Sequence, residues 1–159
     1  MTNKIDLYNS TYGNFKEQVN AEVRRETYGE DIGQNSWITT DEYDMFYSWL
    51  NISAGAHVLE VASGSGGPSL YLAKKFNCKI TGVDINEEGL KTANQQARDA
   101  GIDNASYQFE DLDQRLPFNA ETFDTIMCID SMNHFRNRTF VLSEWKRVLK
   151  TGRRILFTD

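Results

Sequence analysis

This chain of 159 residues has only two cysteines, two prolines and two histidines, and it has no long apolar run. Cys78 and Cys128 lie far apart, each within an apolar stretch. We expect them to be buried, reduced thiols rather than a disulfide or a metal pair. Because no apolar run is long enough to cross a membrane, and the polar N-terminus lacks the core of a signal peptide, we expect a cytoplasmic protein.

A surplus of basic charge is also missing. The chain has 17 Lys and Arg against 23 Asp and Glu, which gives a formal net charge of −6. An acidic chain argues against nucleic acid, and against an anionic membrane surface, as the main partner. The length suits one domain with a core of reasonable size.

The stretch from His57 to Ser69 reads HVLEVASGSGGPS, and the rest of the pattern is arranged around it. Its first half is a short apolar run typical of a buried strand. Gly64, Gly66 and Gly67 then remove side chains where the chain must turn, and Pro68 suits the first turn of a helix. A glycine turn that leads into a helix leaves backbone N–H groups free to meet a ligand. We therefore expect a ligand at this turn.

Strand-like and helix-like segments alternate along the rest of the chain. The expected strands cover residues 57–62, 78–84, 105–109, 123–129 and 154–158, separated by helices over residues 68–76, 86–100 and 138–149. Repeated β-α units with near-continuous apolar strands indicate a parallel sheet covered on both faces. We predict an α/β fold, a Rossmann-like, doubly wound and mostly parallel sheet, over residues 57–159.

Residues 1–56 are expected to form a helical cap. Phe15, Val19 and Val23 have helical spacing within an expected helix over residues 15–28. A second helix is expected to open at a capping box formed by Thr39 and Glu42. The polar loop between these helices is a candidate lid.

Acidic residues stand near the end of each of the first four expected strands or just after it, namely Glu60, Asp84, Asp111 and Asp130. A single such acid is usually a helix cap or a solvated loop residue, but the whole set in register favours a shared ligand. The pyrophosphate of a dinucleotide needs G-x-G-x-x-G, and Ser69 stands where the third glycine would be. A carboxylate just before the turn would repel a pyrophosphate and attract a cation. The acids therefore favour S-adenosylmethionine, which carries a sulfonium and an ammonium and no phosphate.

Five motifs in this order and spacing resemble those of class I S-adenosylmethionine-dependent methyltransferases. They read LEVASGSGGPS, ITGVDIN, FEDLDQRLPF, FDTIMCIDSMNHF and LKTGRRILFTD. The resemblance covers residues 57–159, and the ordered set is specific although each motif alone is weak. It implies that S-adenosylmethionine is the cofactor, that a small molecule accepts the methyl group, and that no metal ion takes part.

The resemblance also assigns cofactor contacts to positions of this chain. Asp84 would accept hydrogen bonds from both ribose hydroxyls, which a carboxylate can do with its two oxygens. The other implied contacts are Glu60, Ala62, Gly64 and Gly66 at the methionyl end, Ile85, Asp111 and Leu112 at the adenine, and Ile129, whose carbonyl would face the ammonium.

The reacting end is expected after residue 129, where Asp130 and His134 are the candidate catalytic residues. The run IDSMNHF resembles phosphoethanolamine and related N-methyltransferases, in which a histidine here assists deprotonation; the alternative is a histidine with a structural hydrogen bond. Residues 28–39 resemble the lid of the same group and would bring Trp37 and Ile38 to the cofactor. Tyr8, Tyr12 and Tyr28 are candidates for a hydroxyl group near the substrate, and the sequence does not choose among them. His57 precedes its strand and is expected to be structural.

The chain departs from the family pattern at its C-terminal end. Methyltransferases of this class continue past the fifth strand with a helix and two more strands. We therefore expect a fold truncated after strand five, which belongs to a longer protein or has its sheet edge completed by a partner chain or a second copy. Two other functions remain open, a nicotinamide-dependent oxidoreductase and a non-catalytic module that binds S-adenosylmethionine.

Overall fold

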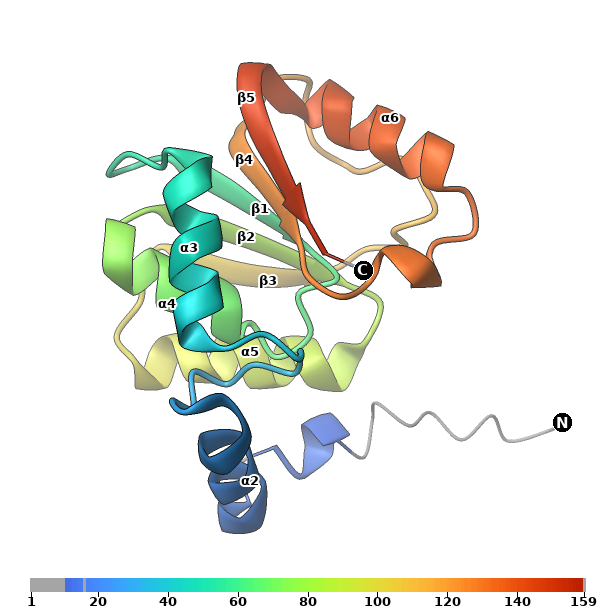
Figure 1. Cartoon of the computed structure of the whole chain (residues 1–159). Coiled ribbons are helices and arrows are strands. Elements are labelled where there is room, and N and C mark those ends of the chain that lie inside the picture. Colours follow the sequence, from blue (N-terminus) through green and yellow to red (C-terminus); the bar gives the residue numbers. More distant parts are fainter. Residues whose placement is uncertain (1–10, 16, 159) are drawn as a thin grey trace, which may run out of the picture.

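Five parallel strands form the centre of the computed structural model, which describes residues 11–15 and 17–158 (Figure 1). The strand order is β3-β2-β1-β4-β5. The direction of the strand order reverses at β1. Strands β2 and β3 lie on one side of β1, and strands β4 and β5 lie on the other. The bounds are His57–Val61 for β1, Lys79–Asp84 for β2, Ala105–Phe109 for β3, Phe123–Cys128 for β4 and Leu149–Phe157 for β5.

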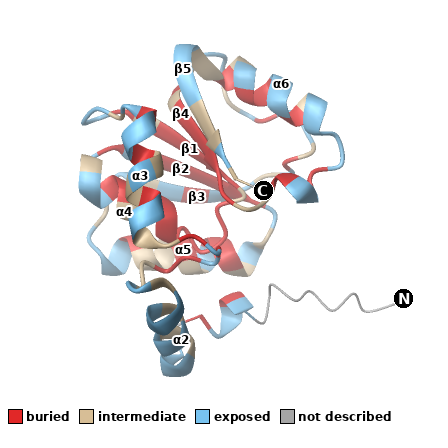
Figure 2. Ribbon diagram, viewed as in Figure 1, coloured by how far each residue is buried: buried red, intermediate tan, exposed pale blue. Residues whose placement is uncertain are grey.

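Helices cover both faces of this sheet, which confirms the predicted doubly wound α/β fold. One face is covered by α3 (Thr40–Leu50), α4 (Gly67–Phe76) and α5 (Glu87–Asp99), and the other by α6 (Arg138–Val148). Neighbouring strand residues alternate between the two cores, because successive side chains point to opposite faces: Val58 packs with α3 and α4, and Leu59 packs with α6. The central strands β1, β2 and β4 are buried at every residue but one each (Figure 2).

The last strand differs from the prediction. The turn expected over residues 150–152 is an irregularity within β5, which begins directly after α6. Phe123 pairs with Leu149, whereas Thr125 pairs with Arg154, so β5 holds extra residues at this point. Gly152 adopts a φ of 77°, which a glycine tolerates without strain. The other predicted strand ends are correct to within one residue.

The N-terminal segment also differs from the prediction in part. Helix α2 spans Gln18–Tyr28, and the apolar side predicted for it is not buried, since Val19 and Val23 are 66% and 53% exposed. Figure 1 shows α2 apart from the sheet. Phe15 is buried but precedes the helix. The capping box at Thr39 is confirmed, because Thr39 N–H donates to Glu42 Oε2 and Glu42 N–H donates to Thr39 Oγ1.

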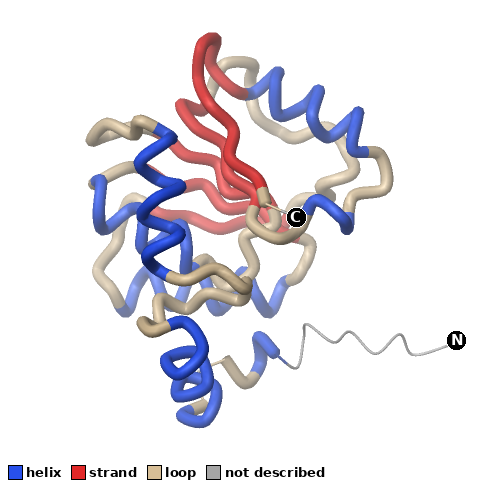
Figure 3. Tube along the Cα trace, in the orientation of Figure 1, coloured by secondary structure: helices blue, strands red, loops and turns tan. Residues whose placement is uncertain are grey.

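The two cysteines are both buried, as predicted, and no disulfide joins them. His57 lies at the start of β1, and its Nε2 is 2.9 Å from Thr81 Oγ1, so its role in the fold is structural. Among the described residues, no helix has the length and apolar character needed to cross a membrane. Tyr8 and Asp159 lie outside the described residues. Figure 3 shows the strand ends converging on one edge of the sheet, where a ligand of this fold binds.

Candidate functional site

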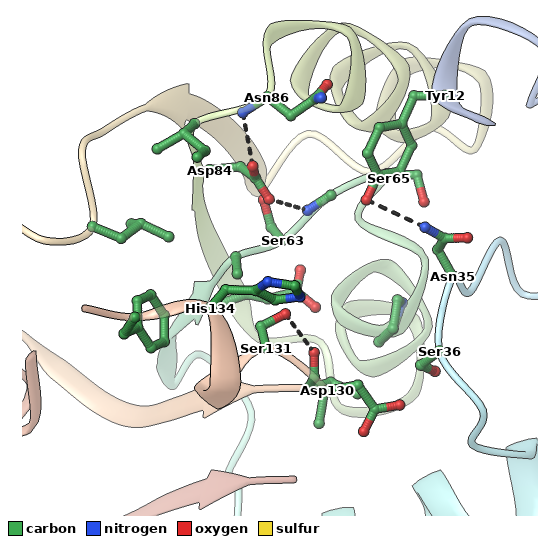
Figure 4. Close-up of a pocket in the computed structure, with 18 of the residues that line it drawn as sticks. Tyr12, Asn35, Ser36, Ser63, Ser65, Asp84, Asn86, Asp130, Ser131 and His134 are labelled. Atoms are coloured by element: carbon green, nitrogen blue, oxygen red, sulfur yellow. Dashed lines mark hydrogen bonds between the residues drawn. The ribbon is translucent and has the colours of Figure 1, made fainter. Parts of the chain in front are cut away.

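A cavity of about 440 Å³ lies at the carboxyl ends of the strands. Its lining comes from the loops after β1, β2, β3 and β4, together with the N-terminal segment (Figure 4). Most residues that the sequence assigned to a cofactor lie together here: Glu60, Ala62, Gly64, Asp84, Ile85, Asp111, Leu112 and Ile129, with Asp130 and His134 beside them.

The turn after β1 forms the floor of this cavity. Ala62 and Gly64 both have positive φ values, of 57° and 49°. A Cβ on Gly64 would lie 2.3 Å from the hydroxyl oxygen of Tyr12, so a glycine is required for both conformation and space. Gly66 does not line the cavity. Its missing side chain makes room instead for Tyr107, whose ring would lie 2.8 Å from a Cβ at that position.

Asp84 is held in place by backbone amides. The N–H of Gly64 donates to Oδ2 at 2.7 Å and the N–H of Asn86 donates to Oδ1 at 2.8 Å (Figure 4). Burial raises the pKa of this carboxyl group above its usual value, and hydrogen bonds from the backbone of Asn86, Gly64 and Ile85 oppose that shift. A carboxylate has about four lone-pair sites, so the side chain is oriented and can still accept a hydrogen bond from a ligand.

Glu60 is the most buried acid of the cavity, with 2% of its surface exposed. Ser69 Oγ, in the first turn of α4, donates to its Oε2 at 2.5 Å. Burial raises the pKa of Glu60 to about 8, and the charge of Asp84 adds to the increase while the Ser69 hydrogen bond opposes it.

The charge of the lining has one sign. Five carboxyl groups line the cavity, and none of the described residues that line it is Lys or Arg. Such a site attracts a cationic ligand and repels a pyrophosphate. No group of His, Cys, Asp and Glu that would hold a metal ion occurs among the described residues. The five carboxyl groups belong to Glu60, Asp84, Asp111, Asp113 and Asp130.

The adenine end expected from the sequence has an apolar and a polar side. Ile85 lines the cavity and is 61% exposed, and Leu112 on the opposite loop is buried. Asp111 Oδ1 accepts a hydrogen bond from the N–H of Asp113, which fixes the loop after β3. A flat ring between Ile85 and Leu112 would meet apolar atoms on its faces and the Asp111 carboxyl group at its edge.

Asp130 connects three segments of the chain. It has a φ of 48°, which is unusual for a residue other than glycine. Its Oδ1 accepts from Thr158 Oγ1 at 2.5 Å, and its Oδ2 accepts from the N–H of Trp37 at 3.1 Å. His134 lies between Asp84 and Asp130 in the view of Figure 4, where its ring faces the cavity. The geometry therefore brings His134 to the cavity and engages both oxygens of Asp130.

Two residues that the sequence assigned to the cofactor lie elsewhere. The Trp37 side chain is 84% exposed, and Ile38 is buried in the core beneath α3. Neither lines the cavity, although the Trp37 amide reaches its rim through Asp130.

Four other residues of the N-terminal half line the cavity in their place: Tyr12, Asn35, Ser36 and Tyr43. Asn35 Nδ2 donates to the Tyr12 hydroxyl at 3.4 Å (Figure 4). Of the two candidate tyrosines that the structure describes, Tyr12 lines the cavity and Tyr28 is half-buried outside it. The polar run GQNS, which lies next to the expected contacts Trp37 and Ile38, was the available signal in the sequence.

The N-terminal loop is docked directly on the glycine turn. Ser65 Oγ donates to the carbonyl of Gly33 at 2.9 Å, and Gln96 Nε2 donates to the carbonyl of Ser65 at 2.8 Å. A Cβ on Gly67 would lie 2.3 Å from the Gly33 backbone. The loop and the turn therefore form one packed unit that closes one side of the cavity.

Comparison with known proteins gives a consistent result. The sequence matches the family described as a methyltransferase domain over residues 58–152, more than half of the chain. It is 29% identical to methyltransferase GfsG of Streptomyces halstedii, covering 98% of this chain and 59% of that protein. It is 26% identical to 27-O-demethylrifamycin SV methyltransferase of Amycolatopsis mediterranei, covering 87% and 54%.

A solved structure shares the fold. An S-adenosylmethionine-dependent methyltransferase from Aquifex aeolicus superposes with a TM-score of 0.71 at 19% identity, covering 93% of this chain and 71% of that one. The chain spans a little over half the length of the two curated relatives.

Proposed function

This chain belongs to the class I S-adenosylmethionine-dependent methyltransferases, and from that premise we propose that it binds S-adenosylmethionine in the cavity and transfers its methyl group to a nitrogen or oxygen atom of a small molecule. The observation that carries the proposal is the oriented carboxylate of Asp84 within an acidic lining that holds no Lys or Arg among the described residues. A sulfonium and an ammonium are the cations that such a lining suits.

The residues present fit this cofactor. The Tyr12 hydroxyl lies where a side chain on Gly64 would point, and the buried hydroxyl of Ser63 has no hydrogen-bond partner among the described residues. We propose that Glu60, with the backbone of Ala62 and Gly64, receives the methionyl end. In the same proposal Asp84 binds the ribose hydroxyls, Ile85, Asp111 and Leu112 hold the adenine, and the Ile129 carbonyl faces the ammonium.

When bound, the cofactor would supply a methyl carbon that is activated by its sulfonium. The chain's own task is then to orient the acceptor and to remove its proton. His134 is the proposed base, because it lies in the cavity and faces its interior. We assign Asp130 a positioning role, since its two oxygens already bind Thr158 and the Trp37 amide.

Residues 29–39 form the proposed lid of this site. Ser65 binds this loop at the Gly33 carbonyl, and Asp130 binds it at the Trp37 amide. Tyr12 and Asn35 close the side of the cavity above Gly64. In this proposal the segment excludes water from the reacting atoms.

The cellular setting is also part of the proposal. Two buried cysteines that form no disulfide suit the reducing cytoplasm. The edge strand β5 offers backbone groups for pairing with a further strand, from this protein, a partner chain or a second copy.

The proposal is tested by titrating S-adenosylhomocysteine into the wild type and an Asp84→Ala variant by calorimetry. We expect the variant to lose about 10- to 100-fold in affinity, since two hydrogen bonds to a charged group are removed. Asp103→Ala is the matched control, because Asp103 is exposed and lies outside the cavity. Equal affinity in all three proteins would contradict the proposal, as would tight binding of NADH without binding of S-adenosylhomocysteine.

A further inference from the structure

Glu60 combines deep burial with a place on the cavity wall. Within the part of the chain that the structure describes, Ser69 is its one hydrogen-bond donor, and it donates to Oε2. The carboxyl group therefore has hydrogen-bonding capacity left on the side of the cavity. A buried carboxylate with one donor is poorly compensated for its lost hydration.

Ser69 is itself held by Tyr107. The Tyr107 hydroxyl lies 2.8 Å from Ser69 Oγ and also donates to the carbonyl of Gly66 at 3.3 Å. Tyr107 reaches this place from β3 because two glycines leave room for its ring. A Cβ on Gly82 would lie 2.1 Å from the ring, and one on Gly66 would lie 2.8 Å away. The position of the Ser69 hydroxyl is thus built into the packing of β2, β3 and α4.

Among the described residues, no Lys or Arg side chain acts on the Glu60 carboxyl group. Asp84 on β2 acts on it with a like charge. Tyr43 and Tyr47 on α3 are phenols whose pKa values are raised by burial and by the Glu60 charge. The neighbouring β4 residue, Met127, is apolar. These surroundings disfavour ionisation of Glu60.

Two further elements complete these surroundings. Tyr107 on β3 is a phenol whose pKa is raised by burial and by Glu60. The Ser69 hydroxyl is the group that α4 presents to the carboxyl group. Asp111, Asp113, Asp130 and His134 also line the cavity. The raised pKa of Glu60, about 8, agrees with this arrangement.

We propose that Ser69 and Tyr107 position the Glu60 carboxyl group so that it holds a proton in the ligand-free chain and releases it when the cationic methionyl end of the cofactor binds. The inference rests on the proposed function. The O–H bond of the carboxyl group breaks, its electron pair stays on the carboxylate that faces the ammonium, and the proton passes to the buffer. Cofactor binding is therefore linked to pH.

The linkage has a defined direction. Below pH 8 the ligand must displace a proton from Glu60, so affinity rises with pH until the ligand-free carboxyl group is ionised. For a group that titrates between about 7 and 8 in the ligand-free chain, the affinity should rise about 10- to 50-fold from pH 6 to pH 8.

The test is calorimetry with S-adenosylhomocysteine, which has the same ammonium, at pH 6, 7 and 8 in buffers of different ionisation enthalpy. The difference between buffers measures the protons released. We expect close to one proton per ligand at pH 6 to 7 in the wild type. Glu60→Gln should reduce this to near zero and flatten the pH profile to less than about threefold. Glu26→Gln is the matched control, since Glu26 is exposed on α2.

Two more variants test the positioning role. Ser69→Ala removes the donor to Glu60, and we expect the midpoint of the pH profile to move up by about half a pH unit or more. Tyr107→Phe keeps the ring and should move it in the same direction by less.

The outcomes separate the two proposals. Binding of S-adenosylhomocysteine without proton release, or release that persists in Glu60→Gln, would overturn this inference alone. An unmoved midpoint in Ser69→Ala would overturn the role of Ser69. Absence of S-adenosylhomocysteine binding at every pH would overturn the proposed function and this inference with it.

Discussion

The Oδ2 atom of Asp84 accepts a hydrogen bond from the backbone N–H of Gly64 at 2.7 Å. This contact joins the end of β2 to the turn after β1, 20 residues earlier in the chain. It fixes the position of the Asp84 carboxylate relative to the turn after β1. The group that would hold the ribose and the turn that would hold the methionyl end therefore keep a constant separation. The site is therefore organised before any ligand arrives.

Gly64→Ala should lower both stability and affinity for S-adenosylhomocysteine. The new Cβ would lie 2.3 Å from the Tyr12 hydroxyl oxygen, which is too close, and residue 64 has a φ of 49°, which side chains other than glycine rarely adopt. We expect a loss of about 2–4 kcal/mol in the free energy of unfolding, measured by urea titration. Gly55→Ala is the matched control, since Gly55 has a φ of 77° and no atom within 4 Å of its Cβ position. Equal losses in both variants would show that the close approach to Tyr12 has no cost.

Glu60→Gln should stabilise the ligand-free chain at neutral pH. Folding raises the pKa of Glu60 from its usual 4.5 to about 8, so the unfolded chain releases this proton first. The stability contributed by the neutral carboxyl group is full below pH 4.5 and is lost as the pH rises toward 8. At pH 7.5 the variant avoids a cost of about 2–4 kcal/mol.

The measurement is the free energy of unfolding of wild type and Glu60→Gln at pH 4.5, 6 and 7.5. The difference between the two proteins should grow with pH. A difference that is constant across this range would mean that Glu60 titrates as an ordinary glutamate.

Asp130→Ala should loosen the N-terminal loop. The variant removes the acceptor of the Trp37 amide and of the Thr158 hydroxyl. We expect hydrogen exchange at the Trp37 amide to become about tenfold faster, which corresponds to a lost hydrogen bond of 1 to 2 kcal/mol. Asp103→Ala should leave this exchange rate unchanged. Unaltered protection in Asp130→Ala would remove the positioning role proposed for Asp130.

Valine substitutions test which helix faces carry the core. Val23→Ala on α2 should change the free energy of unfolding by less than about 0.5 kcal/mol, because Val23 is 53% exposed. Val141→Ala on α6 should cost about 1–3 kcal/mol, because Val141 is 1% exposed and packs against the sheet. Thermal or urea unfolding of the two variants gives the comparison. A large loss in the free energy of unfolding of Val23→Ala would show that the apolar face predicted for α2 from the sequence is buried after all.

Local chemistry explains why much of this fold could be predicted from the sequence. The alternation of Val58 and Leu59 between two cores, and the capping box at Thr39, are encoded by neighbouring residues. The acids after the strands share one edge because parallel strands end together. That rule brings Glu60, Asp84 and Asp111 to one cavity from positions 51 residues apart or less.

The N-terminal half was harder to predict because its contacts are non-local. Trp37 resembles a cofactor contact in sequence, yet its side chain is exposed while Asn35 and Ser36 line the cavity. Which side of an irregular loop faces inward depends on where its backbone is anchored, here at Ser65 and Asp130. The bulge in β5 likewise depends on pairing with β4 and on Gly152.

The central claim is that this cavity binds S-adenosylmethionine with the ribose on Asp84 and the methionyl ammonium on the Glu60 side. A crystal structure of the chain with S-adenosylhomocysteine tests it most directly. The account predicts both ribose hydroxyls within hydrogen-bond distance of the Asp84 carboxylate and the ammonium facing Glu60 and the Ile129 carbonyl. A ligand bound outside this cavity, or bound in it with its ribose away from Asp84, would contradict the account.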